Sequence, residues 1–120
     1  MKHQELEVWN RSMELVTNIY LITKDFPKEE LYGLVSQMRR CAVSIPSNIA
    51  EGCSRFSDKE TLKFLNIALG SISELETQVI ISKNIGYIND IENLQMQNET
   101  VKKLLLGLIR YLNTKTEQIE

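Results

Sequence analysis

Apolar residues recur every three or four positions along four long segments of the chain, and short polar breaks separate these segments. This spacing is typical of amphipathic α-helices, whose buried face returns every 3.6 residues. The first segment carries two adjoining apolar stripes and ends at Phe26-Pro27, because the residue before a proline disfavours the α conformation. The first stripe is Leu6, Trp9, Met13, Val16 and Tyr20, and the second is Val8, Leu15, Ile19 and Ile22.

The second segment extends from about Lys28 to Glu51. Its stripe is Leu31, Val35, Met38, Ala42, Ile45 and Ile49. Pro46 lies inside this pattern, where it removes a hydrogen-bond donor and clashes with the carbonyl four residues earlier. Because the stripe keeps its phase through Pro46, we predict one helix with a kink at Pro46. Gly52 is expected to end this helix.

Capping residues mark the starts of the last two segments. Ser57 and Glu60 have the spacing of a capping box, and Asn89 is the expected N-cap of the fourth helix. Gly86 is expected to end the third helix. The third stripe is Leu65, Ala68, Ile72, Leu75 and Val79, and the fourth is Leu94, Val101, Leu105, Leu108, Leu112 and Ile119. Asn98 interrupts the fourth stripe, either to set the helix register or because that turn faces solvent.

Four helices of roughly 20 to 28 residues with short connections predict an all-α fold, an antiparallel up-down-up-down four-helix bundle. We expect residues 1–120 to form one domain. The scarcity of glycine (5) and proline (2) argues against an all-β or disordered chain. A net charge of −2 gives no positive field that would attract nucleic acid. With no membrane-spanning run, no signal peptide and too few cysteines for a disulfide framework, the expected location is cytoplasmic.

A polar ladder runs beside the apolar stripe of the second helix. The ladder consists of Gln37, Arg40, Ser44, Asn48, Glu51 and Arg55. These positions fall within roughly 40° of one line, and the stripe is centred about 120° away. The ladder therefore flanks the core, and the third helix offers Ser71, Glu74 and Gln78 in a similar place. If the two helices face each other here, Arg40 and Arg55 are expected to form a partly buried network of ion pairs and hydrogen bonds with Glu51 and Glu74. Two interpretations stay open: a polar seam or solvated face, or a groove that binds a ligand or partner.

Other chemistry finds little support in the residue types. Glu51, Glu74 and Glu76 suggest a carboxylate-bridged di-metal site, but such bundles also use histidines and the only histidine is His3. No nucleophile is spaced to join a carboxylate pair, which disfavours an enzyme that uses Glu51 and Glu74. We therefore expect no catalytic residue, no metal and no cofactor. The two cysteines, at positions 41 and 53, are expected to be buried and inert.

Two motifs carry a resemblance to a known family. The first is Ser44-Ile45-Pro46-x-Asn48-Ile49-Ala50-Glu51-Gly52, preceded by Gln37-x-x-Arg40 and followed by Arg55. The second is Phe64-Leu65-x-x-Ala68-x-Gly70-Ser71-x-x-Glu74-Leu75-Glu76. With weaker matches toward the start, the chain resembles the four-helix bundle family first noted as products of intervening sequences in bacterial 23S ribosomal RNA. The resemblance covers nearly the whole chain.

The resemblance implies an antiparallel four-helix bundle that forms ring-shaped homo-oligomers, typically pentamers, with no enzymatic activity. We expect a self-assembling binding or scaffold protein that acts through a polar groove on the second and third helices. The main expected partner is then another copy of the same chain. A weak RNA or protein partner is possible, and no binding to a membrane is expected. The alternative is a nucleic-acid-binding accessory protein, similar to those of diversity-generating retroelements, that uses Arg39, Arg40 and Arg55.

Overall fold

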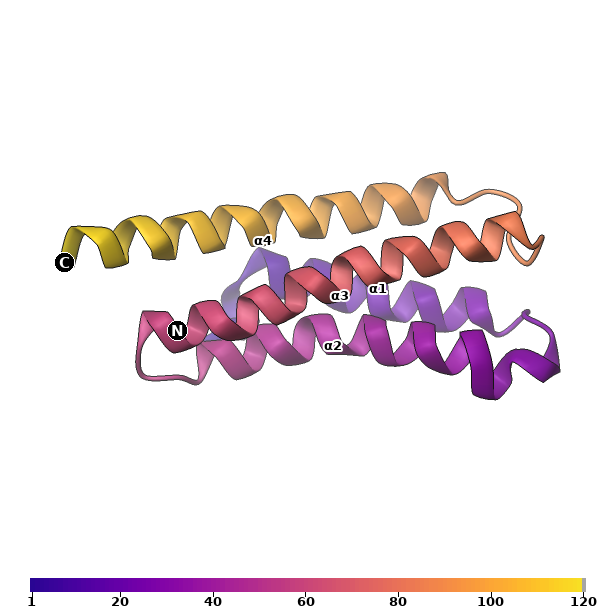
Figure 1. Ribbon diagram of the computed structural model, residues 1–120, viewed down its shortest axis with the longest axis horizontal. Helices are drawn as coiled ribbons and strands as arrows, with labels where there is room; N and C mark the ends of the chain where they lie inside the picture. The colour runs from indigo at the N-terminus through magenta and orange to yellow at the C-terminus, as the bar shows by residue number, and fades with distance from the viewer. Residues whose placement is uncertain (120) are drawn as a thin grey trace.

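Four long helices run side by side along the molecule (Figure 1). The structure is a computed structural model that describes the backbone of residues 1–119 and the side chains of residues 1–115. The helices are α1 (Glu7–Thr23), α2 (Ser36–Cys53), α3 (Asp58–Asn84) and α4 (Glu92–Ile119). Residues 1–119 contain no strand, so the all-α prediction is confirmed.

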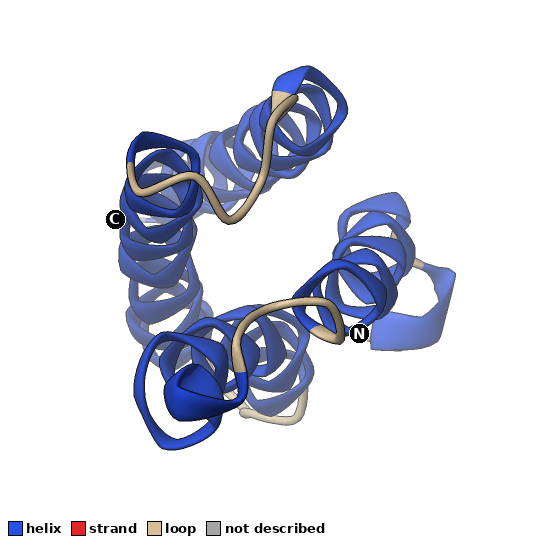
Figure 2. Cartoon of the chain, turned by 90° about the vertical axis from the view of Figure 1, so that its right-hand side faces the viewer, coloured by secondary structure: helices blue, strands red, loops and turns tan. Residues whose placement is uncertain are grey.

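The helices surround one shared interior, as the end-on view shows (Figure 2). The most extensive contact joins α2 and α3, while α1 packs against α2 and α4, and α4 also packs against α3. The connections lie at alternate ends of a body that measures 52 × 23 × 20 Å (Figure 1). Each helix therefore buries its apolar face against two neighbours.

The predicted stripes supply the core. Every residue of the α3 stripe is buried, as are most of those in α2 and in the described part of the α4 stripe. Ile119, the last predicted residue of the α4 stripe, lies outside the described side chains. In α1, the second stripe faces the core through Val8, Leu15 and Ile19, whereas Met13 and Tyr20 of the first stripe are 41% and 40% exposed. The broad apolar face of α1 therefore divides into a core side and a partly exposed edge.

The connection from α1 to α2 differs from the prediction. A 3-10 turn, η2 (Lys28–Glu30), and a single π turn, η3 (Leu31–Val35), precede the regular helix, which begins only at Ser36. Gly33 inside η3 has φ −114° and ψ −111°, which interrupts the helical path. Leu31 is consequently exposed instead of starting the core stripe.

Beyond Ser36, α2 continues through the buried Pro46, as predicted, and ends at Cys53. A bend at Pro46 stays a prediction. Gly52 lies inside the last turn of α2 and does not end it, so that prediction is wrong. Gly86 follows the end of α3 with φ +85°, a conformation that favours glycine. The N–H of Tyr87 then donates to the carbonyl of Ser82 over 2.9 Å.

The predicted caps are partly right. The hydroxyl oxygen of Ser57 accepts from the N–H of Glu60 over 3.2 Å, which confirms this N-cap of α3. At α4 it is Asp90, not Asn89, whose side chain accepts from the N–H of Glu92, over 2.9 Å. The two candidates are adjacent in sequence and are both good capping residues, so the pattern alone did not separate them.

Asn98 is buried in the core, and the interpretation that this turn faces solvent is wrong. Its side-chain amide donates to the carbonyl of Ile72 over 3.2 Å, and its amide oxygen has no hydrogen-bond partner among the described residues. Asn98 thus fixes α4 against α3 at one level of the bundle, which fits the register interpretation.

Candidate functional site

A polar groove opens between α2 and α3, and half of the polar ladder lines it. We call it the α2–α3 groove; its volume is about 450 Å³ and its lining residues are Gln37, Arg40, Cys41, Ser44, Ser71 and Glu74. Five of these six residues are predicted site residues. Cys41 was not predicted there, because the sequence marks it only as a buried thiol.

A chain of hydrogen bonds forms the floor of the α2–α3 groove. The amide of Asn48 donates to the hydroxyl of Ser44 over 3.1 Å, and the hydroxyls of Ser44 and Ser71 lie 2.7 Å apart. The hydroxyl of Ser71 also donates to the carbonyl of Ile67 over 3.2 Å. Because a hydroxyl has one hydrogen, Ser44 supplies the hydrogen between the two serines. This series of hydrogen bonds joins α2 to α3 and uses the hydroxyl hydrogen of each serine.

The Cys41 thiol lies beside this chain and donates to the carbonyl of Ser71 over 3.1 Å. Burial and the neighbouring carboxylate of Glu74 raise the pKa of Cys41 to about 12. A thiol in this state stays protonated near neutral pH and is a poor nucleophile. Burial also raises the pKa of Cys53, and both cysteines are free and buried. The burial predicted for both is confirmed.

Arg40 and Glu74 line the α2–α3 groove but do not pair with each other. No ion pair within 4.0 Å involves either residue among the described side chains, so the predicted Arg40–Glu74 ion pair is absent. Both residues are exposed, and water solvates charges there at little cost. The Glu74 carboxylate accepts a hydrogen bond from the amide of Gln78, at 3.4 Å.

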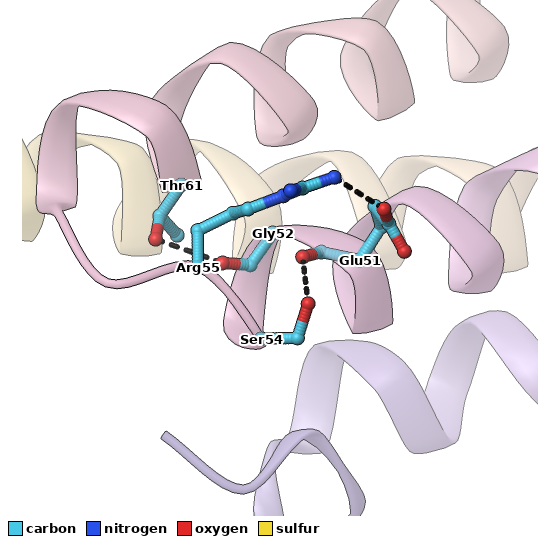
Figure 3. A network of polar contacts seen from close by, with 5 residues as sticks. All are labelled: Glu51, Gly52, Ser54, Arg55 and Thr61. Carbon is cyan, nitrogen blue, oxygen red and sulfur yellow. Dashed lines mark hydrogen bonds and ion pairs between the residues drawn. The ribbon is translucent and has the colours of Figure 1, made fainter.

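The far end of the ladder belongs to a different cluster, at the C-terminus of α2 (Figure 3). Glu51 forms an ion pair with Arg55, one helical turn later. The guanidinium of Arg55 also lies 4.7 Å from the ring centre of Phe64 on α3. The cluster stands away from the residues that line the α2–α3 groove, so the ladder is divided between two places.

Gly52 lets α3 approach α2 closely at this end. The Thr61 hydroxyl donates to the carbonyl of Gly52 over 2.8 Å (Figure 3). A Cβ atom on Gly52 would lie 3.1 Å from the carbonyl oxygen of Thr61 and 3.2 Å from the Cβ of Phe64. Sequence reasoning assigned Gly52 to a helix end and missed this role, which depends on the position of the partner helix.

A second depression, the α1–α2 groove, lies on the other side of α2. Its volume is about 320 Å³, and its lining residues are His3, Trp9, Met13, Val16, Val43, Pro46, Ser47 and Ala50. Met13 and Val43 are exposed and Trp9 is half-buried, so the surface is largely apolar. The partly exposed edge of α1 forms one wall of this groove.

The described residues meet the requirements of neither a metal site nor a membrane-spanning helix. No three His, Cys, Asp or Glu side chains among those residues cluster to hold a metal ion. No described helix is both long and apolar enough to cross a bilayer.

Comparison with known proteins agrees with this architecture. A protein of unknown function from the S23 ribosomal protein family of Bacteroides thetaiotaomicron has a crystal structure that matches with a TM-score of 0.80. The two sequences are 26% identical, and the match covers 92% of this chain and 99% of that one. Among proteins with curated descriptions, none matches. Residues 4–107 match the family described as 23S rRNA-intervening sequence protein. The chain therefore belongs to the 23S rRNA-intervening sequence protein family.

Proposed function

We propose that this protein is a non-enzymatic, cytoplasmic bundle that assembles with copies of itself and serves as a binding or scaffold protein. The α1–α2 groove is the surface for assembly, and the α2–α3 groove is the surface for binding. The ring of about five copies that the family resemblance implies is the assembly we favour.

The observation that carries the proposal is the apolar character of the α1–α2 groove. Met13 is 41% exposed and Val43 is 38% exposed, and both line one continuous depression with the half-buried Trp9. Contiguous apolar surface rimmed by polar residues marks interaction sites, because its exposure to water is unfavourable. A second copy of the chain would cover this surface and remove it from water.

The absence of an activated nucleophile supports a non-enzymatic role. The hydroxyls of Ser44 and Ser71 both donate within the floor of the α2–α3 groove. The thiol of Cys41 stays protonated because its pKa is raised to about 12. No histidine lies among the residues that line this groove. Nucleophilic catalysis needs an activated nucleophile, and neither the serine hydroxyls nor the thiol of this groove is activated.

Substitution of Met13 by Glu tests the assembly surface. A carboxylate in the α1–α2 groove should oppose burial, so Met13→Glu should shift the protein toward the 13.9 kDa monomer in sedimentation velocity. Ser73→Glu is the matched control, because it adds the same charge at an exposed position of α3 outside both grooves. Equal assembly of wild type and Met13→Glu, with the helicity of both intact, would contradict the proposed surface.

A further inference from the structure

The two unpaired charges of the α2–α3 groove lie at the same level of the bundle, on opposite walls. Met38 contacts Ser82, Ser44 contacts Ser71, and Gly52 contacts Thr61, so α2 and α3 run antiparallel. Arg40 is one turn before Ser44 and Glu74 is one turn after Ser71. These offsets bring the two charges to one level.

The other polar groups around the groove are already engaged. The serine hydroxyls donate within the floor, and the thiol donates to the carbonyl of Ser71. The neighbouring Arg39 donates to the hydroxyl of Thr23 over 3.0 Å and lies 4.6 Å from the ring centre of Tyr20. The guanidinium of Arg40, the amide of Gln37 and the remaining acceptor sites of the Glu74 carboxylate are left to meet a ligand.

A buried acceptor without a partner lies one helical turn beyond Glu74 on α3. Gln78 is only 6% exposed, and its amide nitrogen donates to the Glu74 carboxylate over 3.4 Å. Its amide oxygen has no hydrogen-bond partner among the described residues. An unsatisfied buried acceptor gains from any donor that reaches it, whether an ordered water or a ligand ammonium group.

We propose that the α2–α3 groove binds a small zwitterion whose carboxylate meets Arg40 and whose ammonium group meets Glu74. This inference rests on the proposed binding role of the groove. A guanidinium binds a planar carboxylate through two parallel hydrogen bonds, and a carboxylate accepts from an ammonium group. The ligand class is therefore the aminocarboxylates, which include free amino acids.

Charge balance favours this class over simple ions. The groove holds one cation and one anion, while its thiol is neutral. A lone carboxylate at Arg40 would be repelled by Glu74, and a lone amine at Glu74 would be repelled by Arg40. A phosphate would bring a second negative charge toward Glu74. A zwitterion matches both charges and adds no net charge.

Amide chemical shifts of the full-length protein test the proposal. The probes are glycine, β-alanine, γ-aminobutyrate and ε-aminocaproate, which differ in the distance between their charges. Propionate, propylamine and phosphoethanolamine serve as single-charge and phosphate controls. We expect saturable shifts at Cys41 and Ser71, strongest for one spacing, with a Kd of about 1 mM or tighter. Arg40→Gln and Glu74→Gln should each weaken binding about tenfold or more, since each removes a charge-assisted hydrogen bond.

Matched controls are Arg110→Gln and Glu99→Gln, which remove the same charges from exposed positions of α4. The inference is overturned if no aminocarboxylate gives saturable shifts, if propionate or propylamine binds as well, or if both groove variants bind like wild type. If Arg40→Gln abolishes capture of a protein partner while aminocarboxylates do not bind, the groove is a protein-binding surface and the zwitterion inference alone fails.

Discussion

Gly52 and Gly70 both lie inside helices, but only Gly52 has atoms of another helix close to it. The two positions therefore give a matched pair of tests. A Cβ at position 52 would press on the Thr61 carbonyl and on Phe64, whereas a Cβ at position 70 would meet nothing within 4 Å. Gly52→Ala should lower the free energy of unfolding by about 1–3 kcal/mol through overpacking. Gly70→Ala should raise it by about 0.5–1 kcal/mol, because alanine favours the helix. Urea denaturation measures both, and equal stabilisation by the two variants would refute the close approach at Gly52.

The Cys41 thiol should make stability fall at alkaline pH. Its pKa is raised from 9.0 to about 12 by burial and by Glu74, so the folded protein keeps a proton that the unfolded chain releases. The free energy of unfolding therefore falls as the pH rises from 9 toward 12. Denaturation curves across this range should show a shallower fall for Cys41→Ala than for wild type. Parallel falls would mean that the thiol does not titrate as its surroundings imply.

At the scale of elements, Asn98 connects α4 to α3 at a cost in stability. Its amide nitrogen donates to the Ile72 carbonyl, while its buried amide oxygen has no partner among the described residues. Asn98→Leu should raise the free energy of unfolding by about 1 kcal/mol, because it removes an unsatisfied acceptor and adds apolar burial. Thermal and urea denaturation measure the change. A loss of more than about 1 kcal/mol would indicate that an ordered water satisfies the oxygen.

The helical spacing of apolar residues predicted a helix best where burial in the core is the main requirement on its sequence. The α3 stripe is buried along its whole length, and Ser57 caps that helix as expected. The predicted start of α2 was wrong, because Leu31 continues the spacing of the apolar stripe although it lies in a π turn. The spacing of apolar residues alone cannot distinguish a π turn from an α-helix. The two stripes of α1 were both visible, but only packing decides which one faces the core.

The candidate site was predictable to the level of one helix. Spacing placed Arg40, Ser44 and Asn48 on one line, and the line does flank the core. Spacing could not show that Arg40 stays unpaired or that Cys41 joins the groove, because both depend on how α3 docks. The close approach at Gly52 was missed for the same reason.

For the whole molecule, charge argues that nucleic-acid binding is weak and non-specific. The net charge is −2, and Arg39 and Arg55 are already stacked over Tyr20 and Phe64. Few phosphates can then be neutralised, so affinity should be poor at about 150 mM salt. Fluorescence anisotropy with labelled single-stranded RNA should show no sequence-selective complex at nanomolar protein. A tight and selective complex under these conditions would favour the accessory-protein alternative.

The proposed scaffold role depends on self-assembly through the apolar edge of α1. The mass of the wild-type protein in solution tests this self-assembly directly. Sedimentation velocity over a range of micromolar concentrations should give a species at a multiple of the 13.9 kDa chain mass, with five copies for the ring that the family resemblance implies. A single species at 13.9 kDa over that whole range would contradict self-assembly.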